Sequence, residues 1–253
     1  MAENRPQLDG KQLAELMQLI SDADSVELKM TVPDADSRST IRSLELDPIE
    51  AQIRQVVFFD TPDLVLNDRG LVVRARRSQG APDDSVIKLR PVVPSELPDE
   101  LRRTTDFNVE VDAMPGGFVC SASYKGKVSG GDVKQVLQGG QRIRKLFSKP
   151  QRAFYDQHAP EGILLDDLSV LGPITVLKLK WQPADFKRRI VAELWFYPDG
   201  SRILELSTKC APTEAFQVAA EARAFLATKD VDTTGEQQTK TKTALEFFAK
   251  RDD

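Results

Sequence analysis

Residues 71–90 form the stretch that decides the fold, and they read LVVRARRSQGAPDDSVIKLR. Residues 71–77 and 85–90 are expected to be strands, and apolar and polar residues alternate within them over 73–76 and 87–90, which is typical of strands with one apolar and one polar face. The polar, turn-prone residues 79–84 lie between them. The stretch is therefore predicted to form a β-hairpin.

Four basic side chains share the polar side of this predicted hairpin. Arg74 and Arg76 are two residues apart on the first strand, and Lys88 and Arg90 are two apart on the second. Successive side chains of a strand point to opposite faces, so each pair projects to one side of its strand. Cations on adjacent strands repel each other unless an anion or carboxylates lie among them. The hairpin therefore favours a site for a polyanion.

Further strands are predicted along the chain. Alternation predicts them at residues 25–32 and 107–112, a segment rich in Val and Phe predicts one at 55–60, and others are expected near 151–155, 163–168, 174–181, 189–197 and 202–209. Most of these strands are sequence neighbours with links of turn length, which favours antiparallel pairing.

Charged residues also share the polar face of other predicted strands. The sets are Glu27 with Lys29, Glu110 with Asp112, Lys178 with Lys180, and Glu205 with Lys209. Any one set is explained by a solvated sheet face. Together with the four cations of the hairpin, the collective pattern suggests a polyanion site. If the sheet closes into a barrel, these charged faces line its interior and the apolar faces pack outward against helices.

Helices are expected near the N-terminus and within one insertion. Apolar residues at helical spacing follow Asp9, a candidate N-cap, and they are Leu13, Leu16, Met17 and Ile20. Paired glycines interrupt the strand pattern between residues 114 and 140. This segment is interpreted as an insertion of loop character with a short helix at 133–137.

The C-terminal part, residues 212–253, is predicted to be helical. One helix carries an apolar stripe between Phe216 and Leu226, and a second lies near 244–250. We expect this part to belong to the same domain as the strands, so that residues 1–253 form a single α+β domain.

Composition excludes several classes of protein. The 253 residues carry 35 Lys and Arg against 39 Asp and Glu, a net charge of −4, so the total charge does not suggest a nucleic-acid partner. A single histidine, His158, and two distant cysteines, Cys120 and Cys210, do not suit a zinc site or a disulfide scaffold. The glycine-rich motifs of P-loop and dinucleotide-binding folds are missing.

The sequence also predicts where the protein is found. Residues 1–7 are polar, and no apolar run approaches the roughly 20 residues that cross a bilayer. We therefore expect a cytoplasmic protein with no membrane partner. Its oligomeric state is open.

An ordered set of short motifs resembles the CYTH domain, also called the triphosphate tunnel metalloenzyme family. The motifs are Glu27-Leu28-Lys29, Phe59-Asp60-Thr61-Pro62-Asp63 with Leu66, Arg69-Gly70-Leu71, Arg74-Ala75-Arg76, Lys88-Leu89-Arg90 and Glu110-Val111-Asp112. Members include inorganic triphosphatases, thiamine triphosphatases and class IV adenylyl cyclases. The resemblance implies an antiparallel barrel of about eight strands whose tunnel binds a triphosphate and a divalent metal.

The resemblance also implies roles for particular residues. The substrate-binding set is Lys29, Arg74, Arg76, Lys88, Arg90, Arg152, Lys178, Arg189 and Lys209. The metal ligands are Glu27, Glu110, Asp112 and Glu205, the metal is Mg²⁺ or Mn²⁺, and Glu27 and Lys29 are the catalytic residues.

The sequence departs from the family pattern at three positions. Ser25 stands where the opening E-x-E-x-K motif has its first Glu, Asp112 ends the E-x-E of the middle strand, and Ser207 replaces an acid of the closing pair with Glu205. These departures affect the expected metal site more than the phosphate site.

The function implied is metal-assisted hydrolysis of a short linear triphosphate, inorganic or organic. Two alternatives stay open. An adenylyl cyclase would use the same tunnel but would also need a site for the base, and a binding module would keep the basic lining without turnover.

Three other features favour structural interpretations. The segment Asp60-Thr61-Pro62 is interpreted as a turn in which the Asp caps backbone amides. Trp181 and Trp195 are expected to pack rather than to stack on a base. The run 239–243, with Lys240 and Lys242, is interpreted as a helix start with solvated lysines, in preference to a phosphate contact at the tunnel mouth.

Overall fold

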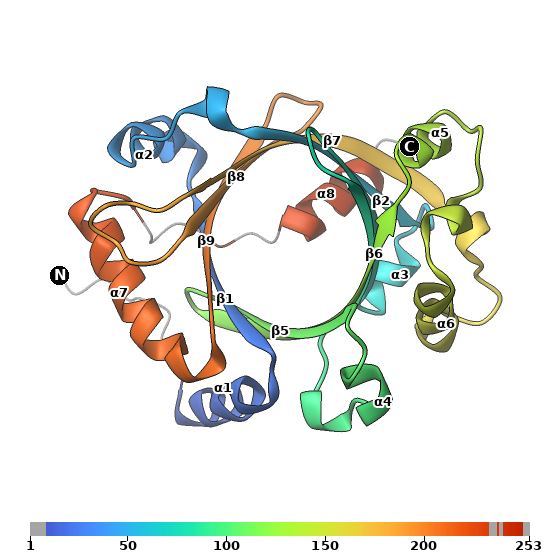
Figure 1. The fold of residues 1–253 in the computed structure, drawn as a ribbon, viewed down its shortest axis with the longest axis horizontal. Helices are drawn as coiled ribbons and strands as arrows, with labels where there is room; N and C mark the ends of the chain where they lie inside the picture. Colours follow the sequence, from blue (N-terminus) through green and yellow to red (C-terminus); the bar gives the residue numbers. More distant parts are fainter. Residues whose placement is uncertain (1–8, 233–236, 238–239, 250–253) are drawn as a thin grey trace.

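The computed structural model describes residues 9–232, 237 and 240–249. Parts of three predictions lie outside these residues: the two ends of the expected domain, Thr239, and Lys250 at the end of the last helix. Figure 1 shows a closed ring of strands with helices around it and one helix, α8, within the opening of the ring.

Nine strands close into a barrel within the part of the chain that the structure describes. They are β1 (Ser25–Val32), β2 (Gln52–Asp60), β3 (Leu71–Ser78), β4 (Asp83–Leu89), β5 (Phe107–Met114), β6 (Gly117–Val128), β7 (Ser169–Trp181), β8 (Ile190–Phe196) and β9 (Arg202–Cys210). Around the ring the order is β1-β5-β6-β4-β3-β2-β7-β8-β9, and β9 pairs with β1. The predicted barrel and the α+β class are confirmed, with one parallel pair, β1 and β5, among otherwise antiparallel neighbours.

Eight α-helices accompany the barrel in the described residues. They are α1 (Gly10–Asp22), α2 (Ser37–Ser43), α3 (Val65–Asp68), α4 (Asp99–Arg102), α5 (Asp132–Leu137), α6 (Lys149–His158), α7 (Ala215–Thr228) and α8 (Lys240–Ala249). The predicted N-cap is confirmed, because Asp9 accepts a hydrogen bond from Gln12 N at 2.8 Å and the Gln12 side chain accepts one from Asp9 N.

The outward faces of the strands are apolar and lie under helices, as the strand pattern predicts. Val26 and Val109 are fully buried in a cluster that includes Ile20 of α1 and Phe154 of α6. On another side of the barrel, Leu226 of α7 packs in a second cluster with residues of β1 and β9. The barrel wall therefore takes its main apolar packing from outside, which leaves its interior for charged side chains.

The last helix, α8, packs against the inner side of the barrel. Ala244 and Leu245 are buried in one apolar cluster with Phe58 of β2, Ile174 of β7 and Trp195 of β8. Here the inward side chains are apolar, and burial against a helix removes that surface from water. The helix predicted near 244–250 is confirmed, and the structure adds that it enters the barrel (Figure 1).

Two predicted strands are wrong. Residues 151–155 belong to α6, because Ser148 and Gln151 form a capping box and a proline occupies the first turn. Residues 163–168 contain only the short 3₁₀ helix Leu165–Asp167.

The prediction of a loop-like insertion between residues 114 and 140 is wrong for the first half of that segment. Residues 117–128 form β6, which pairs with β5 through a tight turn and with β4 on its other side. The short helix expected at 133–137 is confirmed as α5.

Two turns of the chain position the basic hairpin. Asp60 is buried and accepts hydrogen bonds from Thr61 N, Leu66 N and Asn67 N at 2.8, 2.9 and 3.0 Å, so the predicted capping role is confirmed. Gly70 has φ +73°, and a Cβ on it would lie 1.8 Å from the Arg90 carbonyl oxygen. Only glycine fits this approach of β3 to the end of β4.

None of the described helices is long and apolar enough to cross a membrane.

Candidate functional site

The barrel encloses a cavity of about 520 Å³, a volume in the range of small-molecule sites. Among the described residues that line it, lysines and arginines outnumber carboxylates eleven to five. The cations are Lys29, Arg54, Arg74, Arg76, Lys88, Arg90, Lys125, Lys178, Lys180, Lys209 and Lys240, and the carboxylates are Glu27, Glu110, Asp112, Glu193 and Glu205. In a chain of net charge −4, this local excess favours an anionic ligand.

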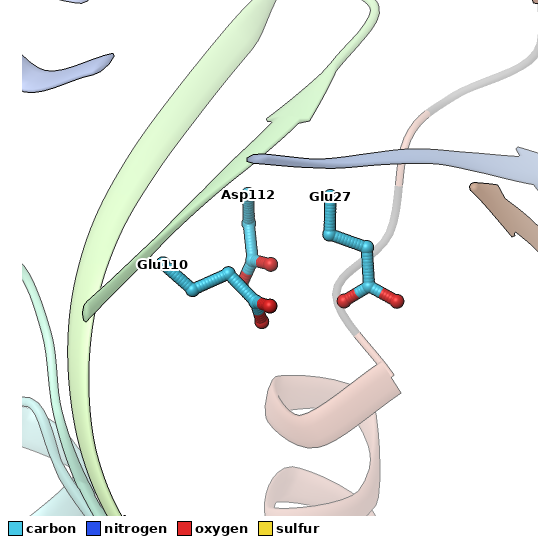
Figure 2. A group of neighbouring side chains, drawn as sticks. All are labelled: Glu27, Glu110 and Asp112. Carbon is cyan, nitrogen blue, oxygen red and sulfur yellow. The ribbon is translucent and has the colours of Figure 1, made fainter. Parts of the chain in front are cut away.

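Three of the carboxylates converge on one point, as Figure 2 shows. Glu27 lies opposite Asp112 in the parallel β1–β5 pair, and Glu110 shares the inward face of β5 with Asp112. One oxygen from each of the three lies within 4.8 Å of the others. These three residues, the carboxylate triad, come from the strand pair that departs from antiparallel order.

Lysines neutralise the carboxylate triad. Lys29 Nζ lies 3.1 Å from Glu27 Oε2 and 2.7 Å from Asp112 Oδ1. Lys88 Nζ lies 3.1 Å from Asp112 Oδ2, and Lys209 forms an ion pair with Glu110. Each carboxylate of the triad thus has an ammonium partner.

These contacts shift the pKa values of the triad. Burial alone would raise the pKa of Asp112, but Lys29 and Lys88 hold it well below its usual range. Burial would also raise the pKa of Glu27, and Lys29 outweighs it, so this pKa is lowered too. Burial would lower the pKa of Lys29, but Asp112 and Glu27 raise it. Glu27, Asp112 and Lys29 are therefore all charged at neutral pH.

The two serines that replace family acids lie beside the triad. Ser25 is opposite Glu110 across the β1–β5 pair, and its hydroxyl donates to Glu110 Oε2 at 3.3 Å. The Ser207 hydroxyl donates to Glu27 Oε1 at 3.1 Å. Both departures thus place a neutral oxygen where the resemblance implies a carboxylate.

A cluster of arginines lies on β2 and β3. Arg74 makes no hydrogen bond or ion pair with any described residue, and burial, with Arg76 next in effect, lowers its pKa to about 10. Arg54 donates to Gln52 Oε1 at 2.8 Å, and Arg76 pairs with Asp84 at 2.9 Å. Arg74 remains charged at neutral pH and presents its five donors to the cavity.

A second acidic pair lies deeper on β8 and β9. Glu193 and Glu205 are opposite each other in register. Lys178 Nζ contacts Glu193 Oε1 at 2.8 Å, and Lys240 of α8 lies between the two carboxylates. Lys240 therefore lies inside the cavity and is not the solvated lysine expected from the sequence.

The structure gathers seven of the nine predicted substrate-binding residues in the cavity. They are Lys29, Arg74, Arg76, Lys88, Arg90, Lys178 and Lys209. Arg152 lies on α6, outside the barrel, where it donates to the Phe147 carbonyl at 2.6 Å, because the strand predicted there is a helix. Arg189 is exposed just before β8 and does not line the cavity.

The predicted metal ligands divide into two groups. Glu27, Glu110 and Asp112 form the triad, whereas Glu205 is paired with Lys240 in the second acidic pair. On β9, Glu205 lies opposite Thr31 while Lys209 lies opposite Glu27, so four residues along the strand separate Glu205 from the triad.

The sequence does not identify two of the cavity residues, favours a solvated position for a third, and gives no role to two others. Arg54 precedes the predicted start of its strand, and Lys125 lies in β6, which was taken as a loop. No local sequence pattern predicts that Lys240 lies inside the cavity, because its position depends on where α8 packs against the barrel. Glu193 and Lys180 had the right strand spacing for an inward position but no assigned role.

The triad suits a hard divalent cation. Its donors are carboxylate oxygens, which Mg²⁺ and Mn²⁺ prefer. Asp112 Oδ1 is buried and accepts no well-aligned hydrogen bond from the described residues, although the Lys29 ammonium is near. An oxygen in this state retains a lone pair for a metal ion.

Comparisons with known proteins give a likeness in structure. No family profile matches the sequence, and no curated protein matches it. A putative adenylate cyclase from Bacillus halodurans superposes with a TM-score of 0.59 at 14% identity, covering 87% of this chain and 97% of that one. A putative adenylyl cyclase from Hippeastrum, described as having a dominant triphosphatase activity, gives a TM-score of 0.64 at 15% identity and covers 87% and 94%. At the level of the fold, this likeness confirms the resemblance to CYTH-type tunnel proteins that the motifs predict.

Proposed function

We propose that this protein hydrolyses a linear triphosphate with the help of Mg²⁺ or Mn²⁺. The observation that carries the proposal is Arg74, a half-buried arginine that lines the barrel cavity and has no hydrogen bond or ion pair with a carboxylate among the described residues. A buried cation without a partner costs several kcal/mol, which an anionic ligand recovers on binding. The Hippeastrum relative, described as a triphosphatase, supports the same class of substrate.

The phosphate-binding groups surround the cavity in a fixed order of strands. Arg74 and Arg76 on β3 and Arg90 after β4 offer guanidinium forks, which grip pairs of phosphate oxygens. Lys88 and Lys178 add point charges from neighbouring strands. A tripolyphosphate chain carries several negative charges in a row, and this arrangement neutralises them together.

The carboxylate triad would hold the metal ion. A divalent ion held by Glu27, Glu110 and Asp112 would supply positive charge next to the phosphates as negative charge develops on the leaving oxygen. Lys29, Lys88 and Lys209 neutralise the triad, and in the presence of a metal ion there their ammonium groups would be available to the phosphates. In this proposal the lysines pair with the carboxylates in the absence of metal and would pair with the substrate phosphates when metal is bound.

Glu27 is the carboxylate best placed to orient the attacking water. Its side chain is 25% exposed, compared with 4% for Asp112. It is ionised at neutral pH, and its Oε1 already accepts from the Ser207 hydroxyl. Lys29 keeps the Glu27 carboxylate in place through their 3.1 Å ion pair. The catalytic roles assigned to Glu27 and Lys29 are thus positioning a water and fixing charge.

The cavity lining favours a substrate without a large aromatic base. Trp195 is the one aromatic side chain among the described lining residues, it is 3% exposed, and the Lys240 ammonium lies 5.2 Å from its ring centroid. Its ring is therefore covered and offers no free stacking surface. This observation supports the proposal of tripolyphosphate rather than ATP as the substrate.

A substrate panel tests the proposal. Tripolyphosphate, thiamine triphosphate and ATP are each incubated with and without Mg²⁺ or Mn²⁺, and products are separated by ion-exchange chromatography. We expect metal-dependent release of orthophosphate, fastest from tripolyphosphate, and loss of that release in Glu27→Gln. Cyclic AMP from ATP would instead identify the cyclase alternative. Binding of all three without turnover at saturating metal would identify a binding module.

A further inference from the structure

Glu193 and Glu205 form a pair that the strand register forces together. They lie directly opposite each other on β8 and β9, and both point into the barrel. Their side chains are 15% and 7% exposed. Like charges at opposed positions of a sheet repel, and the repulsion grows as water is removed. This pair therefore needs a cation.

The cation comes from outside the sheet. Lys240 Nζ lies 2.5 Å from Glu193 Oε2 and 2.6 Å from Glu205 Oε1. Glu205 has no other ion pair among the described residues. On the far side, Lys178 occupies the other oxygen of Glu193, at 2.8 Å. The two oxygens that face Lys240 thus depend on it for neutralisation.

The position of Lys240 is unusual for a lysine. It is the first residue of α8, and the N-terminal end of a helix carries positive partial charge, which disfavours a cation there. Its side chain is only 14% exposed. The two carboxylates therefore account for its position, and the apolar contacts of α8 hold the helix that carries it.

We infer that the Lys240 ammonium is a built-in cation that fills a two-carboxylate site between Glu193 and Glu205, and that it thereby keeps a second divalent metal ion out of the barrel. The site offers one carboxylate oxygen from each residue, both now in contact with Lys240, and carboxylate oxygens are the donor type that Mg²⁺ and Mn²⁺ prefer; Glu193 Oε2 also accepts from Trp195 Nε1 at 3.3 Å. The lysines that pair with the carboxylate triad lie on the barrel strands and not on a helix. The barrel thus contains one exchangeable and one permanently occupied cation site.

This inference concerns the number of metal ions and is separate from turnover. The experiment counts Mn²⁺ bound per chain by isothermal calorimetry and by the electron paramagnetic resonance signal of free Mn²⁺. We expect Lys240→Met to bind one more Mn²⁺ than the wild type. We expect Lys242→Met, which changes an exposed lysine on the same helix, to bind the wild-type number. An equal count for wild type and Lys240→Met overturns the inference.

Two further variants protect the test. Lys240→Met combined with Glu205→Gln should lose the additional ion, which assigns that ion to this pair. Glu205→Gln alone keeps Lys240 and should retain the wild-type count; a reduced count would show that Glu205 already holds a metal ion and would overturn the inference even if Lys240→Met does not fold. A wild type that binds no Mn²⁺ contradicts the proposed function, whereas a gain in Lys240→Met still supports this inference.

Discussion

Two walls of the barrel interior differ in how their charges are neutralised. On the wall of β1 and β5, the carboxylate triad is paired with Lys29, Lys88 and Lys209. On the wall of β2 and β3, Arg74 has no partner among the described residues. Lysine is a compact charge on a flexible stem, whereas arginine is a rigid fork. Under the proposed function, the first wall would hold the metal ion and the second wall would bind the anionic substrate.

The largest expected effect comes from removing a carboxylate from the wall of β1 and β5. Asp112→Asn removes the shared partner of Lys29 and Lys88, and a buried pair that loses one member typically costs about 3–5 kcal/mol. We expect this loss in the free energy of unfolding at pH 7 without metal, measured by urea denaturation. Arg74→Met on the other wall should cost nothing or stabilise, because it removes a repelled cation. Equal losses for the two variants would contradict the comparison.

The effect of Asp112 on stability should also depend on pH. Because the folded protein holds the pKa of Asp112 below that of the unfolded chain, the stabilisation is fully present above the unfolded value of about 3.9. It is lost as pH falls from there toward the lower folded value. The difference in stability between wild type and Asp112→Asn should therefore narrow below about pH 4. A difference that stays constant on acidification would mean that Asp112 is not ionised in the folded protein.

The next effect concerns the arginine-rich wall of β2 and β3. If the arginines await an anion of several charges, tripolyphosphate should raise the melting temperature more than orthophosphate at matched ionic strength. A ligand that binds only the folded state adds about 2.7 kcal/mol at 100 times its Kd. Differential scanning calorimetry measures both shifts. Equal shifts would show that the anions act through general screening and not through the cavity.

The walls themselves could be predicted from the sequence because a strand has a strict period of two. That period placed Arg74 with Arg76, Lys88 with Arg90, and Glu110 with Asp112 on one side of their strands before any pairing was known. Their inward direction followed only if the sheet closed into a barrel, which the structure shows. What the period could not give was the contact between strands distant in sequence. The parallel pairing of β1 with β5, which brings Glu27 to Asp112, is such a contact.

The errors have local physical causes. Residues 153–155 form a short apolar run that a strand could also use, but Ser148, Pro150 and Gln151 carry the stronger signal of a helix start. β6 is rich in Gly, Ser and Ala, so intrinsic propensity for strand is weak and pairing with β4 and β5 decides its structure. Lys240 reaches the cavity only because α8 docks on the inner apolar residues, which is a tertiary effect.

A smaller effect is expected from substituting one residue, Arg74, of the arginine-rich wall of β2 and β3. Arg74→Met should weaken tripolyphosphate binding by about 1.5–3 kcal/mol, the range for hydrogen bonds to a charged group. Arg152→Met is the matched control, because this arginine lies on α6 outside the barrel and should leave binding unchanged. Calorimetric titration measures both. If Arg152→Met loses affinity for tripolyphosphate, or Arg74→Met does not, the anion does not bind at Arg74 on β3.

The smallest expected effect adds charge to the paired wall. Ser25→Glu places a carboxylate beside Glu110, where the Ser25 hydroxyl now donates at 3.3 Å. Without metal the two acids repel, and with metal both attract the ion, so both terms favour metal binding. Because Lys209 already pairs with Glu110 and screens this site, we expect a gain of only about 1 kcal/mol in Mn²⁺ affinity. Ser25→Gln, of equal size but uncharged, is the control, and calorimetry with Mn²⁺ compares the two. If Ser25→Glu binds Mn²⁺ no more tightly than Ser25→Gln, position 25 does not contribute to the metal site, and the proposed match of β1 to the family motif fails at its first residue.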